Sequence, residues 1–313
     1  MMAYAIRRVV TTLPVMGVVA LFVFSLLYLT PGDPAALIAG DQASPADIAR
    51  IRATLGLDRP FLVQFGDWCW RVLHGDLGTS IFTHLPVSYL IGQRLEPTLS
   101  LLLLTLVIAV AVAVPLGVLA AWKHGSALDR LATAVSVLGF SLPVFVVGYL
   151  LAYVFALQLR WVPVQGFTPL SAGLGPFLKN LILPAIALAL LYIALIARIT
   201  RSTMLDALAQ DYVRTARAKG VGQVRVLFVH ALKNAAVPIV TVIGFGFAAL
   251  ISGAVVTESV FAIPGIGRLV TDAILRRDYP IIQGVVLLFS GLYVLINLGV
   301  DLLYTVFDPR IRL

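Results

Sequence analysis

The chain has 313 residues, of which 60% are hydrophobic and only 12% are charged. With a mean hydropathy of +0.99, these values indicate a membrane protein before any motif is considered. The net charge of +8 does not require a nucleic-acid partner, because the basic residues follow a topological pattern described below. A single cysteine, Cys69, excludes an internal disulfide.

Six apolar runs approach or exceed the ~20 residues that a helix needs to cross a bilayer. They cover residues 9–30, 98–121, 131–158, 181–200, 237–257 and 282–307. The first run could instead be a secretory signal peptide. It lacks a small-residue cleavage site and ends in Thr30-Pro31-Gly32-Asp33, so we interpret it as a retained helix. The sequence therefore predicts an all-α integral membrane protein with six transmembrane helices.

The distribution of Lys and Arg predicts the orientation of these helices. With the N-terminus inside, 13 of the 23 basic residues fall on the inner side. Five of the ten outer ones lie in residues 31–97, a segment too long for the positive-inside rule to apply to it. We therefore expect a multi-pass membrane protein with both termini in the cytoplasm.

The outer segment, residues 31–97, is expected to contain helices of its own. Ser44-Pro45-Ala46-Asp47 supplies an N-cap, a proline in the first turn and an acidic residue, and the helix should end at Gly56. A second helix over residues 59–73 places Phe65 and Trp68 on one side. The favoured interpretation is a lid that packs on neighbouring helices; the alternative is direct contact with a substrate.

Within the later spans, several residue types suggest rearrangement or close packing. Pro115, Pro143 and Pro184 each remove a helix hydrogen bond, and we expect each to kink its helix. The fifth span carries glycines in 244–253, for which helix packing is favoured over lining a passage. Phe245 and Phe247, between them, are candidates for an apolar constriction in a pathway.

Residues 211–238 form the longest charged interval in the last two-thirds of the chain. A short helix over 212–219 should end at Gly220, where a left-handed residue closes the helix. A second helical stretch follows, with apolar residues at three- and four-residue spacing. They are Val221, Val224, Leu227, Phe228, Ala231 and Ala235. This is a helix-turn-helix elbow with an apolar side and a basic side, suited to be held by a partner.

The elbow resembles the coupling loop of bacterial ABC-transporter permeases, in which an E-A-A triplet precedes a glycine. Arg214-Thr215-Ala216 occupies the triplet and Gly220 the glycine, with Arg replacing Glu and Thr replacing the first Ala. These departures, and the outer-segment wording LGLDRPFLVQF…HGDLGTS, resemble the dipeptide/oligopeptide importer branch. The resemblance implies that residues 214–217, Lys219 and Gly220 dock on an ATPase subunit. Bulk at Ala216 should then collide with that partner. For Arg214, Arg217 and Lys219 the alternative interpretation is a solvated face.

After the fifth span, residues 257–268 resemble the TE…F…PG…G stretch of importer permeases. Pro264-Gly265 predicts a turn that returns the chain toward the membrane, and Gly267 belongs to the same motif. Glu258 lies near the apolar boundary, where a carboxylate needs a partner. An ion pair with Arg268 is the favoured interpretation; contact with the amino terminus of a substrate is the alternative.

Motifs for chemistry are missing from the sequence. There is no phosphate-binding loop, no nucleophile elbow, and no metal-ligand spacing among the four histidines. We therefore expect no catalytic residue, no metal site and no cofactor bound by this chain. If the protein uses ATP and Mg²⁺, they should bind to partner subunits.

The resemblance implies a type I importer permease that forms half of a translocation pathway for peptides or related small solutes. It also implies three partners: a second homologous permease subunit, ATP-binding subunits and an extracytoplasmic substrate-binding protein. We expect three segments, residues 1–93 (first helix and outer segment), 94–304 (permease domain) and 305–313 (cytoplasmic tail). The alternative is a stand-alone ion-coupled transporter or channel, which should show inverted repeats and midplane charges that we do not find.

Overall fold

The structure is a computed structural model that describes residues 2–29, 35–36, 44–54 and 56–307. Contacts group the chain into two compact units. Unit 1 holds residues 95–268 and 295–313, and unit 2 holds residues 2–94 and 269–294. Residues 269–294 thus belong with the N-terminal part, an association that the order of the sequence does not indicate. Of the expected tail 305–313, positions 308–313 lie outside the described residues.

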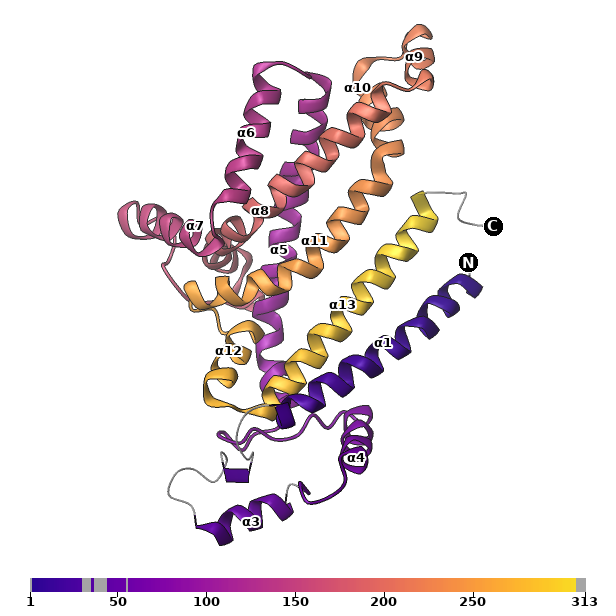
Figure 1. Ribbon diagram of the computed structural model, residues 1–313. Helices are drawn as coiled ribbons and strands as arrows, with labels where there is room; N and C mark the ends of the chain where they lie inside the picture. Colours follow the sequence, from indigo (N-terminus) through magenta and orange to yellow (C-terminus); the bar gives the residue numbers. More distant parts are fainter. Residues whose placement is uncertain (1, 30–34, 37–43, 55, 308–313) are drawn as a thin grey trace. The chain divides into compact units, whose positions relative to one another are not determined.

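Among the residues that the structure describes, five helices are long and apolar enough to cross a membrane. They are α1 (Met2–Leu29), α5 (Val87–Trp122), α8 (Leu174–Leu208), α11 (Leu232–Val260) and α13 (Tyr279–Phe307), all labelled in Figure 1. A bent pair forms a sixth candidate span: α6 (Ala127–Ser141), followed by α7 (Val144–Leu151) and the π-helix η1 (Ala152–Gln158). The all-α fold with six predicted spans is therefore confirmed, with one span broken.

The break lies at Pro143, where the two halves of the third span are bent by 103°. Leu142, the residue before the proline, is extended at φ −97° and ψ 124°. The proline ring excludes the helical region for the residue that precedes it, which ends α6 there. Helices α5 and α8, in contrast, continue through Pro115 and Pro184. The expectation of a prolyl break is thus confirmed at Pro143, while the other two prolines lie within unbroken helices.

Helix α8 is the centre of unit 1 and packs against α6, α7 and α11. Small residues make this close approach feasible, since the backbones of neighbouring helices can then come near each other. A Cβ added to Gly253 of α11 would lie 2.6 Å from Leu188 of α8, and one added to Gly246 would lie 3.2 Å from Tyr192. The packing role predicted for the α11 glycines is therefore confirmed.

In unit 2, an aromatic cluster joins the outer segment to the first span. Helix α3 (Pro45–Thr54) precedes α4 (Phe61–Leu73), and Gly56 between them has φ +67°. The ring of Phe24 in α1 lies 5.5 Å from those of Phe65 and Trp68 in α4, measured between centroids. Trp68 is only 8% exposed. The predicted packing of this helix on a neighbour is confirmed.

A buried carboxylate that the sequence did not single out ties residues 76–86 to the start of α13. Asp278 is 2% exposed and accepts hydrogen bonds from the Ser80 hydroxyl at 2.6 Å and from the Ile81 N–H at 3.3 Å. A buried carboxylate needs such donors, because an unsatisfied one would lose its hydration without compensation. This contact fixes the end of the outer segment within unit 2.

The aromatic cluster predicts different losses of stability when each of two tryptophans of α4 is replaced by alanine. Trp68→Ala should lower the stability of the purified protein by about 3–5 kcal/mol, because the buried ring leaves a cavity. Trp70, which is 66% exposed, is the matched control, and Trp70→Ala should cost little. Thermal unfolding followed by size-exclusion fluorescence measures both. Equal melting temperatures for the two variants would contradict the packing role of Trp68.

Candidate functional site

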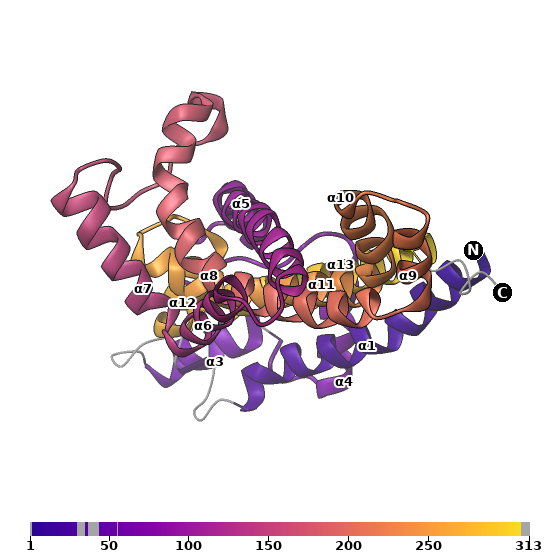
Figure 2. The ribbon, with the colours of Figure 1, turned by 90° about the horizontal axis from the view of Figure 1, so that it is seen from above.

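The elbow is formed by α9 (Asp211–Ala218), α10 (Gln223–Arg225) and the π-helix η3 (Val226–Ala231), which leads into α11. Figure 1 shows it at the ends of α8 and α11, and Figure 2 shows α9 and α10 together near one end of α11. The predicted helix and its stop are confirmed: α9 ends before Gly220, which has φ +76°. Only a residue without Cβ adopts this backbone at little cost.

Two backbone hydrogen bonds close α9 in a Schellman motif. The N–H of Gly220 donates to the Arg217 carbonyl at 2.9 Å, and the N–H of Val221 donates to the Ala216 carbonyl at 3.1 Å. Val221 also packs on the cluster of Val213, Ala216 and Val226, the hydrophobic contact that usually accompanies this motif. The turn is therefore fixed by the chain's own residues.

A second apolar cluster attaches the elbow to the transmembrane helices. Its buried members come from four elements of unit 1: α5, α8, η3 and α11. They are Val118, Ala121, Met204, Ala207, Leu227, Ala231, Ala235 and Ile239. Tyr212 adds a polar contact, since its phenol hydrogen-bonds Asn234; burial raises the pKa of that phenol and the hydrogen bond lowers it. Because these side chains are packed together, a displacement of the elbow would also displace the ends of α5, α8 and α11.

The exposed face of the elbow is basic and partly apolar. Arg214, Arg217 and Lys219 are exposed, and Arg214 has only a solvent-exposed contact of 3.2 Å with Asp211. Such a contact contributes little to stability. Two residues predicted for the buried apolar side, Val224 and Phe228, are instead 72% and 46% exposed. The apolar periodicity therefore overestimated the buried stripe, which consists of Leu227, Ala231 and Ala235 with half-buried Val221.

The remaining elbow residues fall on both sides of this division. Thr215 is exposed, and its hydroxyl donates to the Asp211 carbonyl at 3.0 Å. Ala216 is only 8% exposed and packs on Val213 and Val226. The structure gives a reason for its small size that the sequence did not: a larger side chain there would meet the chain's own core, whereas collision with a partner stays a prediction. The exposed positions, not Ala216, are those that a partner can reach.

An ion-pair cluster near the elbow end of α8 was not found from the sequence. Asp129 of α6 is 4% exposed and accepts hydrogen bonds from Arg201 of α8, with 2.8 Å between Oδ2 and Nη2. The Gly125 N–H and the His124 ring also contact its Oδ2, each at 3.0 Å. Asp129 and Arg201 are 72 positions apart, so no local spacing could indicate this pairing.

At the other end of α11, Glu258 is fully buried and organises the outer turn. The Thr98 hydroxyl donates to its Oε1 at 2.6 Å, and the Arg268 N–H donates to its Oε2 at 3.0 Å. The Ile266 N–H in turn donates to the Thr98 hydroxyl at 2.8 Å. The contact between Glu258 and Arg268 that the structure gives is made by the Arg268 backbone, and the ion pair between their side chains stays a prediction. With no exposed surface, Glu258 has no access to a substrate in this conformation.

The glycines of the motif around Pro264 are explained by the space that the Glu258 carboxylate occupies. A Cβ on Gly265 would overlap the Glu258 carboxylate, and one on Gly267 would lie 2.6 Å from the Val255 Cα. Residues with side chains would therefore displace the turn from Glu258. Ala262, just before it, adopts φ +49°, a left-handed backbone that is costly for a residue with Cβ. The turn carries strain that the hydrogen bonds of Glu258 and Thr98 offset.

The two candidate pathway residues do not face the same side. Phe245 is 57% exposed, whereas Phe247 is half-buried. Two positions apart on an α-helix correspond to a rotation of about 200°. This helix alone therefore cannot bring both rings into one constriction.

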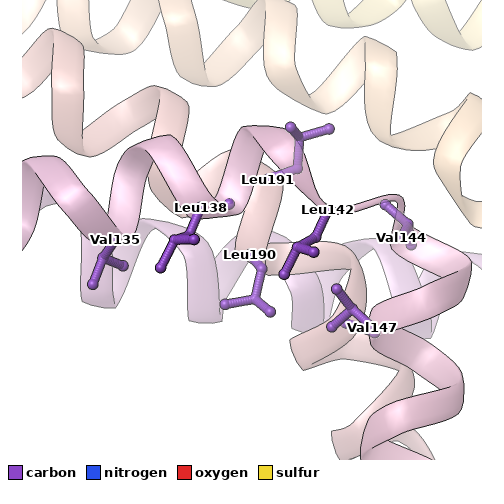
Figure 3. Close-up of a pocket in the computed structure, with 9 residues that line it drawn as sticks. Val135, Leu138, Leu142, Val144, Val147, Leu190 and Leu191 are labelled. Atoms are coloured by element: carbon purple, nitrogen blue, oxygen red, sulfur yellow. The ribbon is translucent and has the colours of Figure 1, made fainter.

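The broken third span encloses a small apolar cavity of about 180 Å³. Figure 3 shows Val135, Leu138 and Leu142 on one side of α6, with Leu190 of α8 and Val147 of α7 beside them. No charged residue lines it, so it is not suited to bind a polar solute. Among the residues that the structure describes, no three His, Cys, Asp or Glu side chains are grouped as a metal ion would require.

The outer turn yields a direct test. Glu258→Gln keeps the shape but replaces one acceptor oxygen by an amide that cannot accept, leaving a buried donor unpaired. It should lower stability by about 1–3 kcal/mol, seen as a lower melting temperature. Glu96→Gln, an exposed carboxylate that accepts only from the Leu170 N–H at 3.1 Å, is the control. A melting temperature unchanged by Glu258→Gln would mean that the carboxylate does not hold the turn.

Comparison with known proteins agrees with this arrangement of helices. The family model for "Binding-protein-dependent transport system inner membrane component" matches residues 113–313, and the model for the N-terminal part of such components matches residues 1–102. The inward-facing MetNI methionine ABC transporter superimposes with a TM-score of 0.59 at 16% identity, covering 70% of this chain and 97% of that one. This likeness shows the fold.

Full-length relatives are closer in sequence. A probable peptide ABC transporter permease of Sinorhizobium fredii is 57% identical, with 99% of each chain covered. A dipeptide transport system permease of Alkalihalophilus pseudofirmus is 41% identical with both chains fully covered. A glutathione transport system permease of Salmonella typhimurium is 42% identical over 100% of this chain and 99% of the relative. The chain therefore belongs to the family of binding-protein-dependent transport system inner membrane components, and it is a permease subunit of an importer.

Proposed function

We propose that this permease subunit forms half of a translocation pathway for peptides, delivered by a substrate-binding protein and driven by separate ATP-binding subunits. The elbow carries this proposal. It is closed by a Schellman motif, attached to three transmembrane helices, and exposes cations and apolar side chains. The peptide class is supported by the names of the relatives, which transport peptides, dipeptides and glutathione.

The exposed face of the elbow fits a groove with an acidic rim on the ATPase subunit. Arg214, Arg217 and Lys219 would meet the rim, and Val224 and Phe228 would enter the groove. Apolar side chains on such a surface lose contact with water when covered, which stabilises the complex by ~25 cal/mol per Å². ATP and Mg²⁺ would bind on the partner, and closure of two ATPase subunits would draw the two elbows together.

The pathway itself requires a second, homologous permease. Phe245 lies on the side of α11 that the chain leaves exposed, where the second subunit or the passage would cover it. Movement of the elbow would reach α5, α8 and α11 through the apolar cluster beneath it. The two subunits would then alternate between outward-open and inward-open arrangements. Family membership leaves the stand-alone transporter without support.

Coupling predicts unequal effects for two nearby glycines. Gly220→Val forces a β-branched residue into the left-handed region at about 1–2 kcal/mol, and its bulk extends where no atom of the chain lies within 4 Å of the Cβ position. Gly222, also in open space but at φ −59°, is the matched control. Gly220→Val should leave the permease in the membrane while abolishing ATPase co-purification and peptide uptake; Gly222→Val should retain both. Normal uptake by Gly220→Val would mean that the elbow is only a connection.

The proposed orientation, with both termini in the cytoplasm, can be tested by cysteine labelling. The background is Cys69→Ser, although burial already raises the pKa of the Cys69 thiol and slows its reaction. In intact cells, an impermeant maleimide should label Asp58→Cys in the outer segment and should not label Val224→Cys in the elbow. Val224→Cys should react only after the membrane is opened. The reverse pattern would overturn the orientation.

A further inference from the structure

Unit 2 contains a cavity of about 810 Å³ that the transport function does not use. Its walls come from the end of α1, the turn after α3, one face of α4, residues 76–81 and the start of α13. This volume is in the range of sites that hold small ligands, roughly 300–1,000 Å³. All its lining residues belong to unit 2, so the cavity is a property of that unit alone.

Helix α4 turns a polar face toward this cavity. Gln64, Asp67 and Arg71 are spaced at three and four residues, which places them on one side of the helix. The aromatic face of α4 is occupied by its contact with α1. The polar stripe borders this space, which also contains Trp68 and Trp70, and Asp67 and Arg71 remain open to solvent and so to a ligand.

The wall of the cavity has as many positive as negative side chains, and one of the positive ones, Arg71, is free to bind a ligand. Two arginines and two aspartates line the cavity, and Arg59 pairs with Asp67 at 2.7 Å. Asp76 accepts a hydrogen bond from the Gly78 N–H at 2.8 Å, which occupies one of its oxygens. Arg71 has no ion pair with any residue that the structure describes. The wall thus offers a guanidinium for a carboxylate and a carboxylate oxygen for an ammonium group.

The start of α13 adds two buried polar side chains to the same wall. Tyr279 is 6% exposed, and its hydroxyl has neither water contact nor a hydrogen-bond partner among the described residues. Gln283 is 8% exposed and uses its amide N–H on the Val23 carbonyl at 3.3 Å. Buried polar groups are normally satisfied, so the Tyr279 hydroxyl beside a cavity indicates a missing partner.

We propose that this cavity binds a short zwitterionic peptide, with its C-terminal carboxylate on Arg71 and its N-terminal ammonium on Asp76. The Trp and Leu side chains of the wall would take its apolar side chains, and a small shift of Tyr279 would let its hydroxyl donate to a peptide carbonyl. Because the wall offers both an unpaired guanidinium and a carboxylate oxygen, a ligand that carries both charges satisfies more of it than an anion or a cation alone. The site lies in unit 2, apart from the elbow, and goes beyond the proposed transport function.

The test is direct binding to the full-length chain in nanodiscs, without ATPase or ATP. Calorimetric titration with the tripeptide Ala-Phe-Ala should show binding, and the same peptide acetylated and amidated at its ends should bind at least tenfold more weakly. Arg71→Gln should weaken binding of the free tripeptide about tenfold but leave binding of its C-amidated form unchanged. Tyr279→Phe, which removes only the hydroxyl, should weaken it about three- to tenfold.

Two control variants, and two results that would contradict the proposal, complete the test. Arg276→Gln, an exposed arginine of unit 2 outside the cavity, and Tyr149→Phe, 60% exposed in unit 1, should bind like the unaltered chain. Equal affinity for free and blocked tripeptide would overturn the proposal, as would a co-purified phospholipid displaced by neither peptide. Because Gly220→Val should abolish uptake yet retain this binding, the failure of one proposal is distinguishable from the failure of the other.

Discussion

Three buried carboxylates, Glu258, Asp129 and Asp278, connect segments that lie far apart in the sequence. In a bilayer, apolar side chains gain little by leaving lipid for another helix, so apolar contact alone defines neither partner nor register. A carboxylate closed to solvent is different, because it must find donors at defined distances. Glu258 accepts a hydrogen bond from Thr98 of α5, and Asp129 accepts one from Arg201 of α8. In unit 2, Asp278 accepts a hydrogen bond from the Ser80 hydroxyl.

The elbow combines a rigid interior with an adaptable exterior, and the proposed coupling role would need both. Its Schellman motif and its two apolar clusters hold the backbone without help from a partner. The side chains left outside are long cations and apolar groups on a solvent-exposed surface. A partner can therefore bind the elbow without reorganising it, which avoids the entropy of ordering a loop on association.

Features encoded over a few residues could be predicted from the sequence. The apolar runs predicted the spans, because a bilayer sets their length. Gly220 predicted the end of α9, and the spacing of Phe65 and Trp68 predicted the packed face of α4. Features that depend on partners far along the chain could not be predicted. Thr98 and Glu258 are 160 positions apart, and nothing local shows which face of α9 Ala216 occupies or that Val224 stays exposed.

The length of α8 has a mechanical consequence. Its 35 residues correspond to about 50 Å, whereas the hydrocarbon layer is about 30 Å thick. The surplus acts as a lever arm, because α9 follows directly from its end. A tilt of roughly 10° about the midpoint would carry that end through about 4–5 Å, nearly one helical turn, given a rise of 1.5 Å per residue. A small rotation inside the membrane would thus become a larger displacement at the end of α8, and the proposed coupling to an ATPase subunit would act along the same helix.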